Sequence, residues 1–261
     1  PKEKKIVRYC KNNSGGVPDN FHNYFVIYFD KDFDEIQTWN AKENSKVDNS
    51  KLSNYLNAEG YHVGAAISFK TKDGEKVNAK VASSFISLEQ AELNLSREIG
   101  NDTFEETKNK AATLWNNELG RIELEGGTIE QYRTFYTALY RVLLFPRKFY
   151  EYNSKNEIVH YSPYNGKVLP GYMFTDNGFW DTFRAVYPFF NMMYPELNSQ
   201  IMEGLANTYK ESGWLPEWAS PGHRDCMIGS NSAPIAVDAF LIKTLPLSLR
   251  LISSVHDNTA D

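Results

Sequence analysis

The feature that most constrains the fold of this chain is a change in the spacing of its apolar residues near residue 86. Before that point, β-branched and aromatic residues form two strand-like runs, NYFVIYFD (23–30) and YHVGAAISF (61–69). After it, apolar residues recur at helical spacing. Strands followed by successive helices indicate two separate domains rather than alternating strand–helix units.

Local motifs refine this division. The pair Asp73-Gly74 within AISFKTKDGEKVNAKVASSFI predicts a tight hairpin turn between two strands. Three segments match a capping box, in which a hydroxyl and a carboxyl or amide group satisfy free backbone amides at a helix start: SLEQ (87–90), TFEE (103–106) and TIEQ (128–131). The second helix is expected to end at Gly120 and the third before Pro146. The intervening RIELEGG (121–127) has a strand-like pattern.

The second half of the chain predicts further helices around a long connection. Residues 147–178 form an aromatic, turn-rich stretch, and connections of that length usually carry a site or a lid. Helical patterning resumes in three segments: FWDTFRAVYPFFNMM (179–193), PELNSQIMEGLANTYKES (195–212) and APIAVDAFLIK (233–243). A ring of paired helices would place its long loops at one end, so we expect residues 147–178 and 212–231 to meet there.

Composition excludes several classes of function. The net charge of −5 and the lack of any block of five like charges argue against nucleic-acid binding. Two cysteines and five scattered histidines provide neither a disulfide framework nor a zinc motif. No run of about 18 apolar residues and no signal peptide occur. The aromatic share of 14% has two interpretations, core packing or a surface that binds sugar rings.

Two stretches, residues 174–188 and 213–240, place acidic side chains beside tryptophan. The candidate acids are Asp176, Asp181, Glu217, Asp225 and Asp238. Hydrolysis of a glycosidic bond needs two carboxyl groups across that bond, one of them kept protonated near neutral pH. An apolar flank achieves this because burial disfavours the anion. Trp214, Pro216 and Trp218 would supply such a flank for Glu217.

Each of these residues also has a plainer interpretation. Trp214 and Trp218 would belong to the core while Glu217 points to water. Asp181 would be an acid in the first turn of a helix, where it complements the helix dipole, with Arg184 as its ion-pair partner. The residues alone leave both interpretations open.

Five blocks in order carry a resemblance to a known family: KVASSFISLEQAELNL, FYTALYRVLLFP, DNGFWDTFRAVYP, GWLPEWA and CMIGSNSAPIAVDAF. The series, which covers most of residues 60–240, resembles glycoside hydrolase family 92, the calcium-dependent exo-acting α-mannosidases of glycan-degrading bacteria. The resemblance implies a multi-domain α+β fold, in which the end of an N-terminal β-sandwich precedes the first half of an (α/α)6 helical barrel. It divides the chain into the C-terminal portion of the sandwich (1–90), linker helices (91–120) and the first part of the catalytic domain (121–261).

The resemblance also implies an inverting mechanism and roles for single residues. Glu217 occupies the place of the general acid, and Trp180 and Asp181 occupy places that contact the sugar in the −1 subsite. Trp218 and Asn231 are expected to bind substrate, although many relatives have a histidine where Asn231 stands. The general base and most calcium ligands are implied to lie beyond residue 261, so metal-binding residues are not assigned.

The expected activity is removal of terminal α-linked mannose, most simply α-1,2-linked, in the degradation of N-glycans. Relatives of this kind are periplasmic or secreted, and mannose-containing glycans would be the partners. We expect the chain to represent the middle of such an enzyme, to be poorly active alone and to self-associate through exposed helix faces. Two alternatives remain: a non-catalytic carbohydrate-binding or truncated fragment lacking the general base, and an (α/α)6 enzyme for another sugar.

Overall fold

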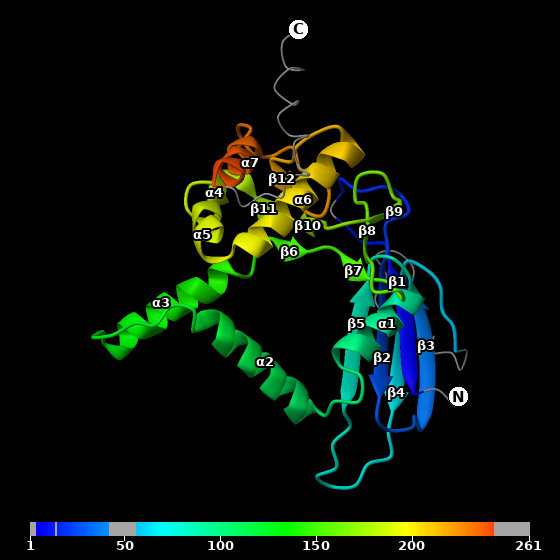
Figure 1. Ribbon diagram of the computed structural model, residues 1–261. Helices are drawn as coiled ribbons and strands as arrows, with labels where there is room; N and C mark the ends of the chain where they lie inside the picture. Colours follow the sequence, from blue (N-terminus) through cyan, green and yellow to red (C-terminus); the bar gives the residue numbers. More distant parts are fainter. Residues whose placement is uncertain (1–3, 14, 42–55, 243–261) are drawn as a thin grey trace.

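The structure is a computed structural model that describes residues 4–13, 15–41 and 56–242. A strand-rich part built from the first strands lies below a helical part, and two helices extend beside both (Figure 1). No helix in these described ranges has the length and apolar composition that crossing a lipid bilayer would require.

The strand-rich part contains two small antiparallel sheets. Its strands are β1 (Lys5–Cys10), β2 (Asn23–Phe29), β3 (Glu35–Ala41), β4 (His62–Ser68) and β5 (Ala79–Ser84). One sheet has the order β1-β2-β5, and the other pairs β3 with β4. Helix α1 (Leu88–Glu98) packs on β5 and β2. The predicted strands in the first 86 residues are therefore confirmed.

The predicted hairpin at Asp73-Gly74 is wrong, although the turn itself forms. Gly74 has a φ of 76°, and the amide of Glu75 donates to the carbonyl of Lys72 at 3.1 Å. The flanking strands nevertheless pair elsewhere, β4 with β3 and β5 with β2. Asn78 explains the choice, because its backbone and side-chain nitrogens both donate to the carboxylate of Asp30, at 3.0 and 2.6 Å. These bonds fix the start of β5 beside the end of β2.

Two helices project beside both parts of the molecule (Figure 1). They are α2 (Phe104–Leu119) and α3 (Ile129–Val142). Both begin with the predicted capping box. The box predicted for α1 forms only in half: Ser87 accepts from the amide of Gln90, but the Gln90 side chain donates to Asn94 Oδ1 and to the carbonyl of Tyr152 instead. The expected strand at 121–127 is wrong: the hydroxyls of Tyr132 and Tyr136 donate to the carbonyls of Leu124 and Ile122, at 3.0 and 2.9 Å, and hold this segment on α3 as a loop.

The long connection is not purely turns, because it contains short strands. They are β6 (Arg147–Lys148), β7 (Glu151–Tyr152), β8 (Ile158–Tyr161), β9 (Val168–Pro170), β10 (Phe174–Thr175) and β11 (Asn177–Gly178). The strands β7, β8 and β9 form one sheet, and β10 pairs with β6.

The expected helix over 179–193 is two helices. The elements of this region are α4 (Phe179–Thr182), α5 (Val186–Met193), α6 (Pro195–Ser212), β12 (Trp218–Ala219) and α7 (Ser232–Leu241). Pro188 explains the break, because a proline has no N–H to donate within a helix but is tolerated in a first turn. Restarting at Val186 puts Pro188 in the first turn of α5.

The main core lies between α5, α6 and α7. Tyr187, Phe190, Met202, Ile235 and Ala239 are at most 1% exposed there. A second apolar cluster joins the N-terminal segment to the long connection, and its buried members are Phe21, Phe149, Tyr161 and Met173. The two parts of the molecule thus share an apolar contact, which helps to hold the helical part in place.

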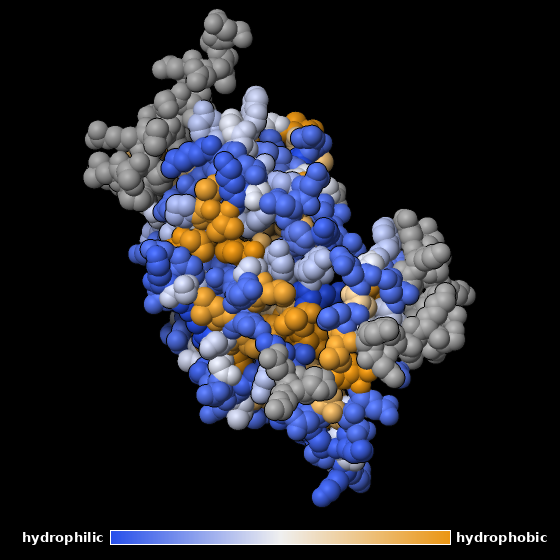
Figure 2. Space-filling model, turned by 90° about the vertical axis from the view of Figure 1, so that its right-hand side faces the viewer, coloured by the Kyte–Doolittle hydropathy of each residue, from blue (hydrophilic) through white to orange (hydrophobic). Residues whose placement is uncertain are grey.

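Many apolar side chains remain exposed. Helix α2 has no buried residue, and Phe104 at its start is 70% exposed. Figure 2 shows apolar side chains gathered over the middle of one face of the molecule. The described helices and sheets give a mixed α/β arrangement, while completion of a helical barrel stays a prediction.

Candidate active site

A short strand pair brings the two predicted site segments together. Strand β11 pairs with β12, so that Gly178 lies opposite Trp218. The amide of Phe179 donates to the carbonyl of Glu217 at 3.1 Å, and the hydroxyl of Thr175 donates to the carbonyl of Pro221 at 3.1 Å. The predicted meeting of residues 147–178 with residues 212–231 is confirmed.

Glu217 is partly buried at the N-terminal end of α7. Its Oε2 accepts a hydrogen bond from the backbone amide of Asn231, the residue that precedes α7, at 3.0 Å. Burial raises the pKa of the Glu217 carboxyl above its usual value, and the Asn231 bond opposes this in part because it favours the anion. The side chain therefore holds its proton more readily than an exposed glutamate.

Three tryptophans of these segments are exposed. Trp180 is 46% exposed, Trp214 74% and Trp218 37%. The interpretation that Trp214 and Trp218 belong to the core is therefore wrong. Pro216, in contrast, is fully buried and anchors the loop beside Glu217. Exposed indoles offer flat apolar faces of the kind on which sugar rings stack.

Asp181 lies close to this strand pair. A Cβ at position 178 would lie 2.7 Å from Oδ2 of Asp181, so the carboxylate rests against the bare backbone of Gly178. Arg184 does not form the expected ion pair with Asp181 in the described structure. Its guanidinium lies 5.1 Å from the ring centre of Trp180 and donates to the Trp180 carbonyl at 3.0 Å. The carboxylate of Asp181 thus stays exposed to solvent.

The remaining candidate acids have other surroundings. Asp176 has a left-handed backbone with a φ of 57°, accepts from Ser220 Oγ at 2.9 Å and pairs with Arg147 at 3.3 Å. It therefore fastens the strand pair. Asp225 and Asp238 are exposed.

The predicted residues are thus brought together unequally. Trp218 lies opposite Gly178 in the β11–β12 pair, the carboxylate of Asp181 lies beside Gly178, and Trp180 adjoins Asp181 in α4. Asn231 contacts Glu217 through its backbone, whereas its side-chain amide donates to the carbonyl of Ile228 at 2.7 Å. The pattern of the sequence did not reveal His223, which lies in the same loop as Glu217, because a lone histidine carries no motif.

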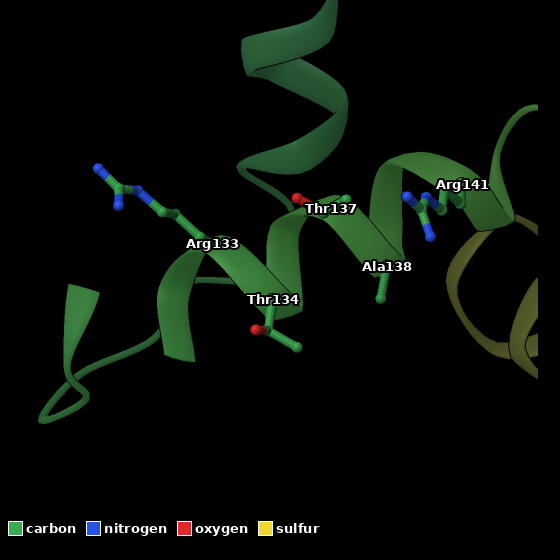
Figure 3. A pocket seen from close by; sticks show the side chains of 5 residues that line it. All are labelled: Arg133, Thr134, Thr137, Ala138 and Arg141. Atoms are coloured by element: carbon green, nitrogen blue, oxygen red, sulfur yellow. The ribbon is translucent and has the colours of Figure 1, made fainter. Parts of the chain in front are cut away.

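Two further features bear on ligand binding. Within the described ranges, no group of three or more His, Cys, Asp or Glu side chains could hold a metal ion. A shallow concavity on α3 is lined by five residues of that helix (Figure 3): Arg133, Thr134, Thr137, Ala138 and Arg141. None of them belongs to the segments that carry the candidate acids.

Two family models match this chain. Residues 1–84 match the glycosyl hydrolase family 92 N-terminal domain, and residues 90–256 match the glycosyl hydrolase family 92 catalytic domain. The chain belongs to glycosyl hydrolase family 92. Both segments that surround Glu217 lie within the match to the catalytic domain.

Solved structures of the family are similar to this family 92 chain. The family GH92 inverting mannosidase of Bacteroides thetaiotaomicron VPI-5482 is 46% identical with a TM-score of 0.86, over 98% of this chain and 34% of that one. A family GH92 α-mannosidase of Bacteroides thetaiotaomicron, solved with mannoimidazole, is 27% identical with a TM-score of 0.72, over 93% of this chain and 32% of that one.

One curated protein is also similar to part of the chain. An uncharacterized secreted glycosidase of Arthroderma benhamiae is 29% identical over 171 residues, which are 64% of this chain and 18% of that protein. The family 92 chain therefore spans about a third of the length of the solved relatives and about a fifth of the curated one.

Proposed function

We propose that this family 92 chain carries the general acid of an inverting α-mannosidase, and that Glu217 is that acid. The observation that carries the proposal is the environment of one carboxyl group. Glu217 is partly buried, its pKa is raised by that burial, and exposed tryptophans adjoin it in the chain. The candidate acid in the same loop, Asp225, is exposed. The solved mannosidases of the family support mannose as the sugar.

In the proposed reaction Glu217 donates its proton to the glycosidic oxygen as the bond to the leaving group breaks. Trp180 and Asp181 hold the terminal mannose, the indole by apolar contact and the carboxylate by accepting hydrogen bonds from hydroxyl groups. Trp218 and Asn231 bind beside them. In an inverting enzyme a second carboxylate, about 6.5–9.5 Å from the acid, activates water on the opposite face of the sugar. That base remains assigned by family resemblance to a position after residue 261.

The finer parts of the proposal rest on the family. They are the (α/α)6 barrel, the division at residues 90 and 120, α-1,2 linkage specificity, N-glycans as substrates and self-association through exposed helix faces. Export to the periplasm or the medium is supported by the relative described as secreted. Calcium is expected from the family, with most of its ligands beyond residue 261; among the described residues no group of three or more His, Cys, Asp or Glu side chains could hold a metal ion.

The decisive experiment measures mannose release from α-1,2-mannobiose in the presence of calcium. The assay uses a protein that contains this chain together with the downstream segment implied to carry the base. Its parent form, Glu217→Gln and Glu125→Gln are compared; the last makes the same chemical change at an exposed glutamate in the loop before α3. The proposal expects release by the parent and by Glu125→Gln, and loss with Glu217→Gln. Mannose release at equal, measurable rates by all three proteins would refute Glu217 as the acid.

The exposed tryptophans favour a second candidate function, sugar binding without turnover. It predicts no mannose release from any of the three proteins, and saturable binding of mannobiose that survives Glu217→Gln. Calorimetry with the same proteins distinguishes the two functions.

A further inference from the structure

Both ends of the loop that carries Glu217 are hydrogen-bonded to one hydroxyl group, that of Ser212. Helix α6 ends at Gly213, which has a left-handed φ of 83° and donates to the carbonyl of Tyr209 at 2.7 Å. Immediately before it, Ser212 Oγ accepts from the amide of Trp214 at 3.1 Å. The same oxygen contacts Nε2 of His223 at 2.9 Å, eleven residues further along the chain. Residues 213–222 thus form a closed loop.

The direction of the His223 bond follows from the surroundings of Ser212 Oγ. The carbonyl oxygens of Thr208 and Trp214 lie 2.8 and 3.0 Å from it, and such short contacts between oxygens are favourable only when a hydrogen lies between them. The single hydroxyl hydrogen therefore points to a carbonyl. Nε2 of His223 must then be the donor, which requires hydrogen on that nitrogen.

His223 is held in place from several sides. Its ring packs against that of Tyr164, with 4.6 Å between the ring centres. Its backbone bridges to Ala219, and the neighbouring Gly222 is buried so closely that a Cβ there would lie 2.0 Å from the carbonyl oxygen of Gly16. The hydrogen bond to Ser212 therefore joins the end of α6 to a segment fixed independently by other contacts.

Between these two fastened ends lies the acid. Pro216 is buried, the Glu217 carbonyl accepts from Phe179, and the Glu217 carboxyl accepts from Asn231. We propose that Ser212 and His223 are positioning residues: their hydrogen bond closes the loop and holds the Glu217 carboxyl in its partly buried place beside the Asn231 amide. The inference rests on the proposed function for its catalytic meaning, but the closure itself concerns only this chain.

The test compares variants that separate the ring from the hydrogen bond. His223→Phe keeps an aromatic ring against Tyr164 and removes the donor, His223→Gln keeps a donor near the place of Nε2, and Ser212→Ala removes the acceptor. The readout is the pH titration of the Glu217 carboxyl carbon by NMR, assigned with Glu217→Gln, together with the thermal midpoint of each protein.

Burial is the larger cause of the raised Glu217 pKa, so an opened loop moves the titration down toward the ordinary value of 4.5. We expect this shift in His223→Phe and Ser212→Ala, and a titration like that of the parent in His223→Gln. Variants that lose thermal stability while the Glu217 titration stays in place would overturn the inference, since that outcome describes a merely structural bond.

A measurement on the parent chain keeps the inference testable if the variants do not fold. Burial lowers the pKa of His223, so its ring is neutral at pH 8. Long-range nitrogen–proton correlation should then find the hydrogen on Nε2, and a hydrogen on Nδ1 would contradict the inference. The mannobiose assay is separate: unchanged turnover in Glu217→Gln would refute the proposed function, while the titration and the tautomer would still decide the loop closure.

Discussion

Replacing Gly178 by alanine tests whether Asp181 binds the sugar, without removing any polar atom. Gly178 has φ −96° and ψ 113°, a conformation open to alanine, so the backbone is not strained. The added Cβ would lie 2.7 Å from Asp181 Oδ2, whereas ordinary contacts begin at 3.4 Å. The exposed carboxylate must therefore move by about 0.7 Å, the difference between these two distances.

The expected effect falls on catalysis and not on stability. Misplacing a substrate-positioning group by about 1 Å costs up to about 100-fold in rate. Gly178→Ala should therefore lower kcat/KM for mannobiose by up to about 100-fold, equivalent to about 2.7 kcal/mol. The thermal midpoint should change little, because the displaced carboxylate is free to rotate into solvent.

A double-mutant cycle with Asp181→Ala shows whether the effect passes through that carboxylate. Once the carboxylate is gone, the closest remaining neighbour of the Cβ at position 178 is the flexible end of the Met227 side chain, 3.3 Å away, so Gly178→Ala should have little further effect. For a protein that binds without turnover, the mannose dissociation constant replaces kcat/KM in the same cycle. Parent-like values for Gly178→Ala, or equal losses in both backgrounds, would refute the argument that Asp181 is positioned on Gly178 to hold the sugar.

Three further predictions concern charge and stability. The raised pKa of Glu217 contributes stability that is complete below pH 4.5 and is lost as pH rises through the folded-state pKa. Over this pH range the thermal midpoint of Glu217→Gln should therefore rise relative to that of the parent. A difference between the two midpoints that does not change with pH would contradict the raised pKa of Glu217. Asp176→Ala loses the contacts with Arg147 and Ser220 and leaves alanine in a left-handed backbone, so its free energy of unfolding in urea should fall by about 1–3 kcal/mol. Asp176→Asn should lose less, because asparagine tolerates that backbone. Glu151 accepts from the hydroxyl of Ser84 at 2.9 Å, so Glu151→Ala should cost about 1–3 kcal/mol in the same assay, and parent-like unfolding would show that this contact between the two parts is dispensable.

The structure separates what local sequence predicts from what it does not. Capping boxes involve residues three apart, so the starts of α2 and α3 were predicted to the residue. Pro195 and Gly213 mark the start and the end of α6, and these signals are also local in the sequence. Strand pairing is not local. Asp73-Gly74 makes its turn, but β5 pairs with β2, next to Asn78, which binds a carboxylate 48 residues away in the sequence.

The candidate site shows the same division. A motif singled out Glu217 and the two tryptophans beside it, since those residues are adjacent in the chain. Its partial burial, the amide of Asn231 14 residues later and the closure by His223 appear only when the loop is folded. Sequence left open whether the tryptophans belong to the core, because composition alone does not distinguish a buried indole from one that is exposed for binding.

The bond from Asn231 gives Glu217 two properties that a general acid needs. Because the amide donates to Oε2, the proton of the neutral carboxyl group lies on Oε1, the oxygen left free to face a glycosidic oxygen. In the resting state burial raises the pKa of the Glu217 carboxyl, and this bond opposes the rise only in part. As the proton leaves, negative charge develops on the carboxylate and the bond becomes charge-assisted. In the proposed reaction the amide would therefore stabilise the transition state more than the resting state, which is the condition for an interaction to accelerate the reaction.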